Sequence, residues 1–186
     1  MSEYQYYEFC RINGPLSKEI RQTMHSLSSR AQVGTHGASY VYNYGDFRGN
    51  PKELLLKYFD VFFYISNFGT IQLMFKYSPG EIEIDEVKKY CIEDVVNCEV
   101  NEQGIVLTID ISNEDGFGWT DGEGLLPTFL PLYDEIKAKN YQFLELVSAV
   151  NDRLMGAEFD SLNAMIAQHI LSSAQRAFLD STNIGR

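Results

Sequence analysis

The apolar residues of this chain follow two different periods, and the change from one to the other falls near Gly124. Before that point, apolar side chains alternate with polar ones in short runs, most clearly in residues 71–77 and 105–111. After it, apolar residues return every three or four positions. Alternation is typical of strands with one buried face, and the longer period is typical of helices that pack along one side. The pattern therefore predicts an α+β fold in which the strands precede the C-terminal helices.

The first part of the chain, residues 1–123, predicts a mainly antiparallel sheet of five to six strands with two or three helices. Turn sequences at residues 67–70 and 101–104 each separate two strand-like runs, and hairpins pair their strands antiparallel. Residues 61–66 are apolar on both faces, as in a central strand, and residues 33–37 predict a loop. The strand-like runs are residues 4–12, 39–44, 61–66, 71–77, 96–100 and 105–111.

Residues 124–186 predict a C-terminal helical section of the same single domain, which spans residues 1–186 and contains no linker of low complexity. Three apolar stripes mark the helices of this section, and the third runs from Leu162 through Ile170 to Phe178. His169 falls on that stripe, so we expect a buried or interface histidine there rather than a catalytic one.

The stretch NYGDFRGNPKELLLKYFD, residues 43–60, combines a glycine-flanked turn, a helix start and a block of aromatic residues. Asn50 is a good N-cap, Pro51 suits the first helical position, and Glu53 is placed to complete a capping box. Each feature has a structural explanation. We therefore interpret the stretch as a corner between a strand and a helix rather than as an active-site loop.

The net charge of −11 is concentrated in one segment of the chain. Residues 81–123 hold 13 acidic residues against only Lys88 and Lys89, whereas the parts on either side are close to neutral. Such a field repels phosphate backbones and attracts basic partners, so we expect no direct nucleic-acid binding. The alternative is a solvated acidic face that only keeps the protein in solution.

Composition and motifs favour a cytoplasmic protein without a cofactor. The N-terminal MSEYQYYEF lacks the basic start and apolar stretch of a signal peptide, and no apolar run approaches the length of about 20 residues that crosses a bilayer. Cys10, Cys91 and Cys98 form neither an even set nor a metal-binding spacing, so we expect reduced thiols and no metal. The nucleotide-binding glycine motifs, the Gly-x-Ser-x-Gly elbow and the His-Glu-x-x-His pattern are missing.

One candidate for binding a partner protein is an aromatic corner formed by Tyr42, Tyr44, Phe47 and Arg48. Exposed Tyr and Arg side chains carry much of the energy of protein interfaces. The alternative is that these tyrosines pack under a helix.

The other candidate is the acidic loop NEDGFGWTDGEG, residues 113–124. Its oxygen ligands do not fall in the register of an EF-hand, and a weak cation site remains open as an alternative. We expect a loop that Trp119 pins to the domain or presents to a partner. The partner-binding candidates in this loop are Glu114, Asp115, Trp119, Asp121 and Glu123.

Several segments together resemble a family of uncharacterised bacterial proteins. They read YEF, PLS, SSRA, YNYGDFRGNP, LL, KYFD, FYISNFGT and LMF, followed by GEG and PL. The pattern is Y-x-Y/W-G-D-F-x-G-x-P, then Y-F-D and N-x-G-T, and the resemblance covers roughly residues 6–150. Members often carry Trp at the positions of Tyr44 and Phe68. The resemblance implies a shared fold and an association with bacterial defence systems, including CRISPR-type loci.

These observations favour a non-catalytic protein-binding role, as an adaptor or accessory subunit of a larger bacterial assembly. We expect a partner protein that presents a basic surface, and no membrane association. The other hypothesis is an enzyme of unrecognised type, in which His36, Asp46, Arg48 and the acidic loop converge on a pocket. A deep pocket that joins those groups favours the enzyme, and an open acidic or apolar face favours the binding protein.

Overall fold

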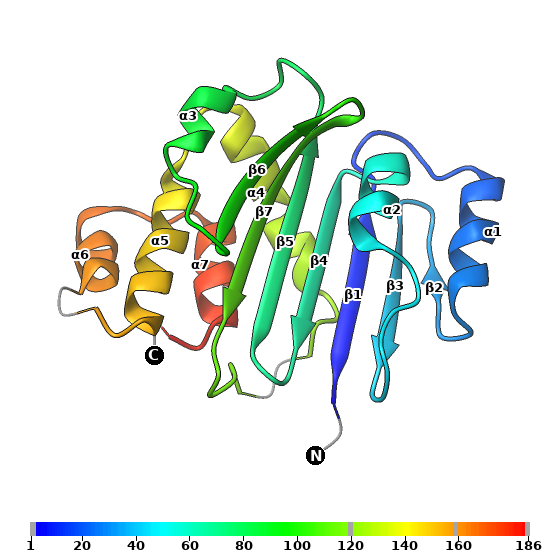
Figure 1. Cartoon of the computed structure of the whole chain (residues 1–186), viewed down its shortest axis with the longest axis horizontal. Helices are drawn as coiled ribbons and strands as arrows, with labels where there is room; N and C mark the ends of the chain where they lie inside the picture. The colour runs from blue at the N-terminus through cyan, green and yellow to red at the C-terminus, as the bar shows by residue number, and fades with distance from the viewer. Residues whose placement is uncertain (1–2, 119–120, 158–159, 185–186) are drawn as a thin grey trace.

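The computed structural model describes residues 3–118, 121–157 and 160–184, and one antiparallel sheet forms its centre (Figure 1). Seven strands lie in the order β2-β3-β1-β4-β5-β7-β6, and all neighbours pair antiparallel. The predicted α+β class and antiparallel sheet are confirmed, with seven strands rather than five to six. The strands are β1 (Gln5–Cys10), β2 (Gln32–Val33), β3 (Gly37–Tyr42), β4 (Val61–Ser66), β5 (Thr70–Tyr77), β6 (Val96–Asn101) and β7 (Gly104–Ser112).

The strand that the sequence did not predict is β2, which lies at one edge of the sheet. Its two residues, Gln32 and Val33, pair with Ser39 and Ala38 of β3. A segment of two residues is too short to show a period, so the pattern of apolar residues gives no sign of it. At the centre of the sheet, β4 has three strands on either side, as its apolar run predicted.

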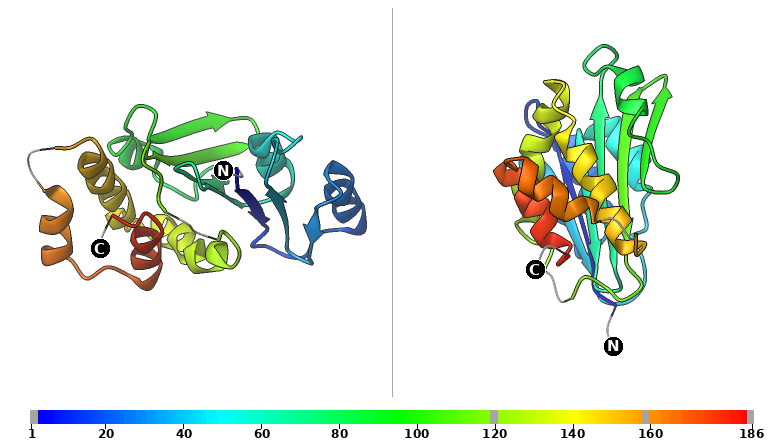
Figure 2. Two further views of the ribbon diagram at one scale, coloured as in Figure 1. Left: turned by 90° about the horizontal axis from the view of Figure 1, so that it is seen from below. Right: turned by 90° about the vertical axis from the view of Figure 1, so that its left-hand side faces the viewer.

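The described residues form seven helices: three in residues 1–123, where two or three were predicted, and four in the C-terminal section, where three apolar stripes predicted three. Figure 1 shows α4 and α7 behind the sheet, α5 beside the edge formed by β6, α2 in front of the sheet, and α1 beyond the edge formed by β2. Figure 2 shows α5, α6 and α7 gathered at the end of the molecule farthest from α1. The helices are α1 (Lys18–Leu27), α2 (Pro51–Tyr58), α3 (Ile84–Lys88), α4 (Leu125–Lys137), α5 (Gln142–Leu154), α6 (Ser161–Gln168) and α7 (Ser173–Ser181).

The larger core lies between the sheet and the C-terminal helices. Phe63 of β4 meets Phe129 of α4 edge to face, with ring centroids 5.3 Å apart, and Tyr77 of β5 stacks on Tyr133 of α4 at 4.5 Å. The alternation of the two hairpins, β4–β5 and β6–β7, therefore turns one face towards the helices, as predicted. The alternating residues in this core are Ile71, Leu73, Phe75, Tyr77, Ile105, Leu107, Ile109 and Ile111.

A smaller aromatic core lies on the other face of the sheet, under α2 and beside α1. Phe9 of β1 is completely buried there, with its ring centroid 5.1 Å from that of Phe59 and 4.8 Å from that of Phe62. The predicted N-cap of α2 is confirmed, because Asn50 Oδ1 accepts a hydrogen bond of 3.2 Å from the amide of Glu53. The carboxylate of Glu53 accepts from Asn50 Nδ2 at 3.4 Å instead of completing the predicted capping box. The stretch of residues 43–60 is thus a corner that places α2 over this core.

The prediction of one long helix for the last apolar stripe is wrong. The stripe is divided between α6 and α7, and Ile170 between them is 95% exposed. Ser172 and Gln175 form a complete capping box, which starts α7 afresh and competes with continuation of the apolar period. His169 is therefore the C-cap of α6 and is exposed, rather than buried on a helical stripe.

Candidate functional site

The acidic segment, residues 81–123, is partly neutralised by lysines. Four of its carboxylates form ion pairs: Glu81 with Lys137, Glu83 with Lys139, Glu86 with Lys89 and Glu99 with Lys52. Three of these lysines lie outside the segment, so the folded chain presents less uncompensated negative charge here than the sequence indicates. Partly exposed pairs of this kind contribute little to stability, but they weaken the field that a partner meets. A partner-binding role must rest on the carboxylates outside these pairs.

One carboxylate of the acidic loop is tied to the start of the sheet. The hydroxyl of Tyr4 donates a hydrogen bond of 2.9 Å to Asp121 Oδ1. The amide of Glu123 donates to the same oxygen at 3.0 Å. Asp121 therefore holds the loop in place, whereas the carboxylate of Glu123 extends from an exposed residue.

The other predicted residues of this loop are exposed or lie outside the described part of the chain. Glu114 and Asp115 follow the end of β7 and are both exposed. Trp119, which we expected to pin the loop or to meet a partner, lies outside the described residues. Among the described candidates of this loop, Glu114, Asp115 and Glu123 are exposed and are not used, as Asp121 is, to hold the loop in place.

The aromatic corner divides into a buried and an exposed half. Tyr42 and Phe47 are each only 8% exposed, and both rings lie within about 6 Å of the ring of Tyr7 in the smaller core. Tyr44 is 74% exposed and Arg48 is exposed. Tyr42, the last residue of β3, and Phe47, in the segment between β3 and α2, therefore lie in the core rather than on an exposed binding surface. The exposed residues of the corner are therefore Tyr44 and Arg48.

The residues of the alternative enzyme site do not all meet. The carbonyl of His36 accepts a hydrogen bond of 2.7 Å from the amide of Arg11, just beyond Cys10 at the end of β1. Asp46 accepts a hydrogen bond of 3.2 Å from Gln5 Nε2, at the start of β1. A strand of this length spans about 17 Å. His36 and Asp46 therefore lie near opposite ends of β1.

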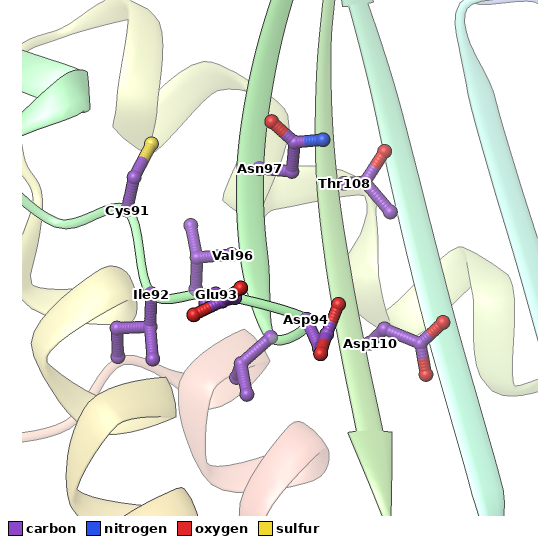
Figure 3. A pocket seen from close by; sticks show the side chains of 9 residues that line it. Cys91, Ile92, Glu93, Asp94, Val96, Asn97, Thr108 and Asp110 are labelled. Atoms are coloured by element: carbon purple, nitrogen blue, oxygen red, sulfur yellow. The ribbon is translucent and has the colours of Figure 1, made fainter.

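An open pocket of about 520 Å³ lies where the turn before β6 meets β6 and β7. Figure 3 shows the carboxylates of Glu93, Asp94 and Asp110 along one side of this pocket, with Asn97 and Thr108 on the two neighbouring strands. No described residue forms an ion pair with any of these three carboxylates. We call this feature the acidic pocket.

A tight turn brings Asp94 beside β7. Ile92 and Val96 exchange backbone hydrogen bonds of 3.0 and 2.9 Å, and the amide of Asp110 donates to the carbonyl of Val95 at 2.8 Å. These bonds extend the pairing of β6 with β7 into the turn. Asp94 itself has φ of 60°, in the left-handed region that Asp and Asn tolerate better than most residues. The sequence of the turn and its position in the sheet thus place a carboxylate at the pocket.

Asp110 is the half-buried member of the acidic pocket. Gln72 Nε2 donates a hydrogen bond of 2.6 Å to Asp110 Oδ2. Burial raises the pKa of Asp110, the nearby charge of Asp94 raises it further, and the hydrogen bond from Gln72 lowers it. A positively charged group in the pocket offsets both effects that raise this pKa. The acidic pocket is therefore suited to receive a cation.

A second pocket, of about 400 Å³, lies near the opposite edge of the sheet. Ser28 and Arg30, which follow α1, line it together with Tyr42, Tyr44 and Arg48. Ser28 is the C-cap of α1. No pattern in the sequence indicates that Arg30 lies in one pocket with Arg48. We call this feature the arginine pocket.

Three further observations limit the chemistry of the described residues. No group of three His, Cys, Asp or Glu side chains among them is arranged to hold a metal ion. The three cysteines are free, and burial raises the pKa of the Cys10 thiol to about 11, so this thiol is a poor nucleophile at neutral pH. In the described part of the chain, helices long and apolar enough to cross a membrane are absent.

Comparison of the chain with protein-family models, with curated proteins and with solved structures finds no match. The two pockets are therefore interpreted from their own geometry and charge.

Proposed function

We propose that this protein is a non-catalytic binding protein that recognises a basic segment of another protein at the acidic pocket. The observation that carries the proposal is the group of three carboxylates, Glu93, Asp94 and Asp110, which line one open pocket without an ion-pair partner among the described residues. The corresponding role is that of an adaptor or accessory subunit of a larger assembly. The family resemblance implies that this assembly is bacterial and of the defence type, including CRISPR-type systems.

A lysine or arginine side chain is the group that best complements the acidic pocket. Carboxylates held close together repel one another, and ionising the half-buried Asp110 costs free energy that an entering cation offsets. Arginine presents five N–H donors in a planar fork that matches carboxylate oxygens. The volume of about 520 Å³ leaves room for such a side chain together with bridging water.

The position of the pocket favours a partner in an extended conformation. The acidic pocket adjoins β6, which is the last strand at its edge of the sheet. An edge strand offers backbone N–H and C=O groups to an added strand. At the pocket the backbone of Val96 is already paired with Ile92, so a partner segment can add only along the part of β6 beyond Val96, and from there it can place one basic side chain in the pocket. Because charge complementarity mainly raises the association rate, binding should be fastest at low salt.

The probe for this proposal is a fluorescent arginine-rich peptide, and its affinity is measured by fluorescence anisotropy at low and at physiological salt. The test variant combines Glu93→Gln with Asp94→Asn, because Asn keeps the tolerance for the left-handed backbone of Asp94. The matched control combines Glu114→Gln with Asp115→Asn, which removes the same charge from an exposed loop. We expect the pocket variant to bind about tenfold more weakly, which corresponds to the loss of roughly one close charge interaction.

The control variant distinguishes binding of the peptide at the acidic pocket from attraction by the overall negative charge of the protein. An equal loss of affinity in both variants means that the peptide responds only to net charge, and it contradicts a role for the acidic pocket. An unchanged affinity of the pocket variant contradicts it as well. The native partner is then sought with the original chain and both variants as baits in extracts of the native host, followed by quantitative mass spectrometry. A partner bound at this site is retained by the original chain and the control, and is lost with the pocket variant.

A further inference from the structure

We infer that the arginine pocket is a binding site for a small molecule that carries a phosphate monoester. The pocket lies between the end of α1 and the end of β3, and both of these ends point to the lower right of the sheet in Figure 1. In the described sheet, β2 pairs only with Ser39 and Ala38 of β3. The rest of this edge of β3, which ends at Tyr42, lies beside the pocket. The arginine pocket therefore lies near the edge of the sheet opposite the acidic pocket, and the inference does not rest on the proposed function.

Two arginines give this pocket a positive charge in a strongly acidic protein. Arg30 and Arg48 both line it, and none of its described lining residues is acidic. Neither guanidinium forms an ion pair with a described carboxylate, although the chain has 26 acidic residues against 15 basic ones. Two guanidinium groups on a pocket of this size repel each other. An anion between them removes that repulsion and accepts hydrogen bonds from both.

Neighbouring groups hold one of the arginines in place. The guanidinium of Arg30 lies over the ring of Tyr42, 5.8 Å from its centroid, which is within the range of a cation–π interaction. Edge contacts with Tyr7 and Phe47, at 6.0 and 6.4 Å between ring centroids, fix the Tyr42 ring in the core. The amide of Arg30 donates to Ser28 Oγ at 3.1 Å. Because Ser28 Oγ accepts this bond, its own proton stays available to donate to a ligand.

The chemistry of the lining points to a phosphate monoester rather than to a carboxylate. A monoester carries a charge of about −1.5 to −2 at neutral pH, which matches two guanidinium groups, and it has three strong acceptor oxygens. Ser26, Ser28 and Ser29 line the same pocket, and the hydroxyl of Ser26 donates to the carbonyl of Thr23 at 2.7 Å, which leaves Ser28 and Ser29 as the serines for a ligand. A volume of about 400 Å³ falls within the range of small-molecule sites. The exposed ring of Tyr44 borders the pocket and is available to contact the body of the ligand.

The overall charge argues for a small ligand instead of a nucleic acid. A net charge of −11 repels a long phosphate backbone over its whole length. A single phosphate group entering the pocket meets mainly the two nearby arginines, because solution salt screens charges beyond about 8 Å. The class of ligand we infer is therefore a small phosphorylated metabolite.

The test titrates the full chain with AMP, phosphoserine, inorganic phosphate and adenosine, by calorimetry and by NMR of the backbone amides. We expect saturable binding of at least one monoester, with shifted amide signals confined to residues 26–30 and 42–48, and no binding of adenosine. Tighter binding of AMP identifies a nucleotide, and tighter binding of phosphoserine identifies a phosphorylated amino acid or peptide. Binding of inorganic phosphate as tight as that of both esters contradicts an ester ligand. Tighter binding of a single-stranded RNA oligonucleotide at the same amides contradicts a small ligand.

Variants link the binding to the two arginines. Arg30→Gln and Arg48→Gln should each weaken binding of the monoester about tenfold, because charge-assisted hydrogen bonds are lost. Arg48→Lys keeps the charge but loses the planar fork, so its affinity for the monoester should lie between that of the original chain and that of Arg48→Gln. Arg176→Gln on α7 is the matched control, since it removes the same charge from an exposed residue outside the pocket. If Arg30→Gln does not fold without its contact to Tyr42, then Arg48→Gln decides. Wild-type affinity in Arg48→Gln, or an equal loss in the control, overturns the inference.

Discussion

The hydroxyl of Tyr4 donates a hydrogen bond of 2.9 Å to Asp121 Oδ1, across 117 positions of the chain. The same hydroxyl accepts a hydrogen bond of 3.1 Å from the buried amide of Gly122. This contact fastens the acidic loop to the residue that precedes β1. Neutralising Asp121 to test partner binding would therefore also loosen the loop, which is why the carboxylates of the acidic pocket make a cleaner test.

Replacement of Tyr4 by Phe should destabilise the fold by about 1–3 kcal/mol, because the buried amide of Gly122 then loses its partner. The free energy of unfolding is measured by urea denaturation. Tyr44→Phe is the matched control, since Tyr44 is 74% exposed and its change should stay within about 0.5 kcal/mol. A cost for Tyr4→Phe as small as that of the control contradicts a structural role for this contact.

The sequence predicted the parts of the fold that rest on local signals. The alternation in β5 and β7, the hairpin turns and the cap of α2 by Asn50 all lie within a few residues, and the structure confirms each of them. The break between α6 and α7 was missed because the capping box at Ser172 outweighs an apolar period that continues through it. The pattern of neighbouring residues thus predicts which helices and strands form, whereas competing capping signals decide where they begin and end.

The pockets were not predicted because they depend on pairing between distant segments. Asp94 and Asp110 lie 16 positions apart and meet through the register of β6 on β7. Arg30 and Arg48 share a pocket because α1 and β3 end on the same side of the sheet. The neutralisation of the acidic segment by Lys52, Lys137 and Lys139 likewise depends on the fold and not on any spacing in the sequence.

The stability of the protein should respond to the charge of Asp110. Its pKa in the folded state is raised above the usual 3.8, mainly by burial, so the folded state holds this proton more tightly than the unfolded chain does. The contribution of Asp110 to stability is thus fully present below that usual value and is lost as the pH rises through the raised pKa. Asp110→Asn, which cannot ionise and still accepts from Gln72, should be more stable than the original chain at neutral pH.

The measurement for Asp110 compares urea midpoints at neutral pH and at a pH below the usual value. The advantage of Asp110→Asn should shrink as the pH falls, because the original carboxyl is then protonated in both states. Asp110→Ala is the control, and it should lose part of the gain because Gln72 Nε2 is left without its acceptor. A neutral-pH stability of Asp110→Asn below that of the original chain would show that the charge is favourable where it stands.

The ion pair between Lys52 of α2 and Glu99 of β6 should contribute little to stability, although it joins two distant elements. Both side chains are partly exposed, at 36% and 44%, so solvent screens the attraction. A double-mutant cycle with Lys52→Met and Glu99→Gln should give a coupling free energy of about 0.2–1 kcal/mol that falls as salt is added. A larger coupling that does not change with salt would mean that α2 depends on this pair for its position.

Gly69, in the turn between β4 and β5, should be the glycine whose replacement most disturbs the acidic loop. It has φ of +95°, and a Cβ on it would lie 1.9 Å from the carbonyl oxygen of Asn113, where the loop leaves β7. Gly69→Ala therefore has two costs, the positive φ and a collision with backbone that has little freedom to move. Gly80→Ala is the matched control, because Gly80 has φ of +86° and no atom within 4 Å of the added Cβ. We expect the control to cost about 1–2 kcal/mol and Gly69→Ala at least about 2 kcal/mol more, measured by urea denaturation. Equal costs for the two substitutions would mean that the segment at Asn113 can move away from the turn, and that the acidic loop is not held by β4 and β5.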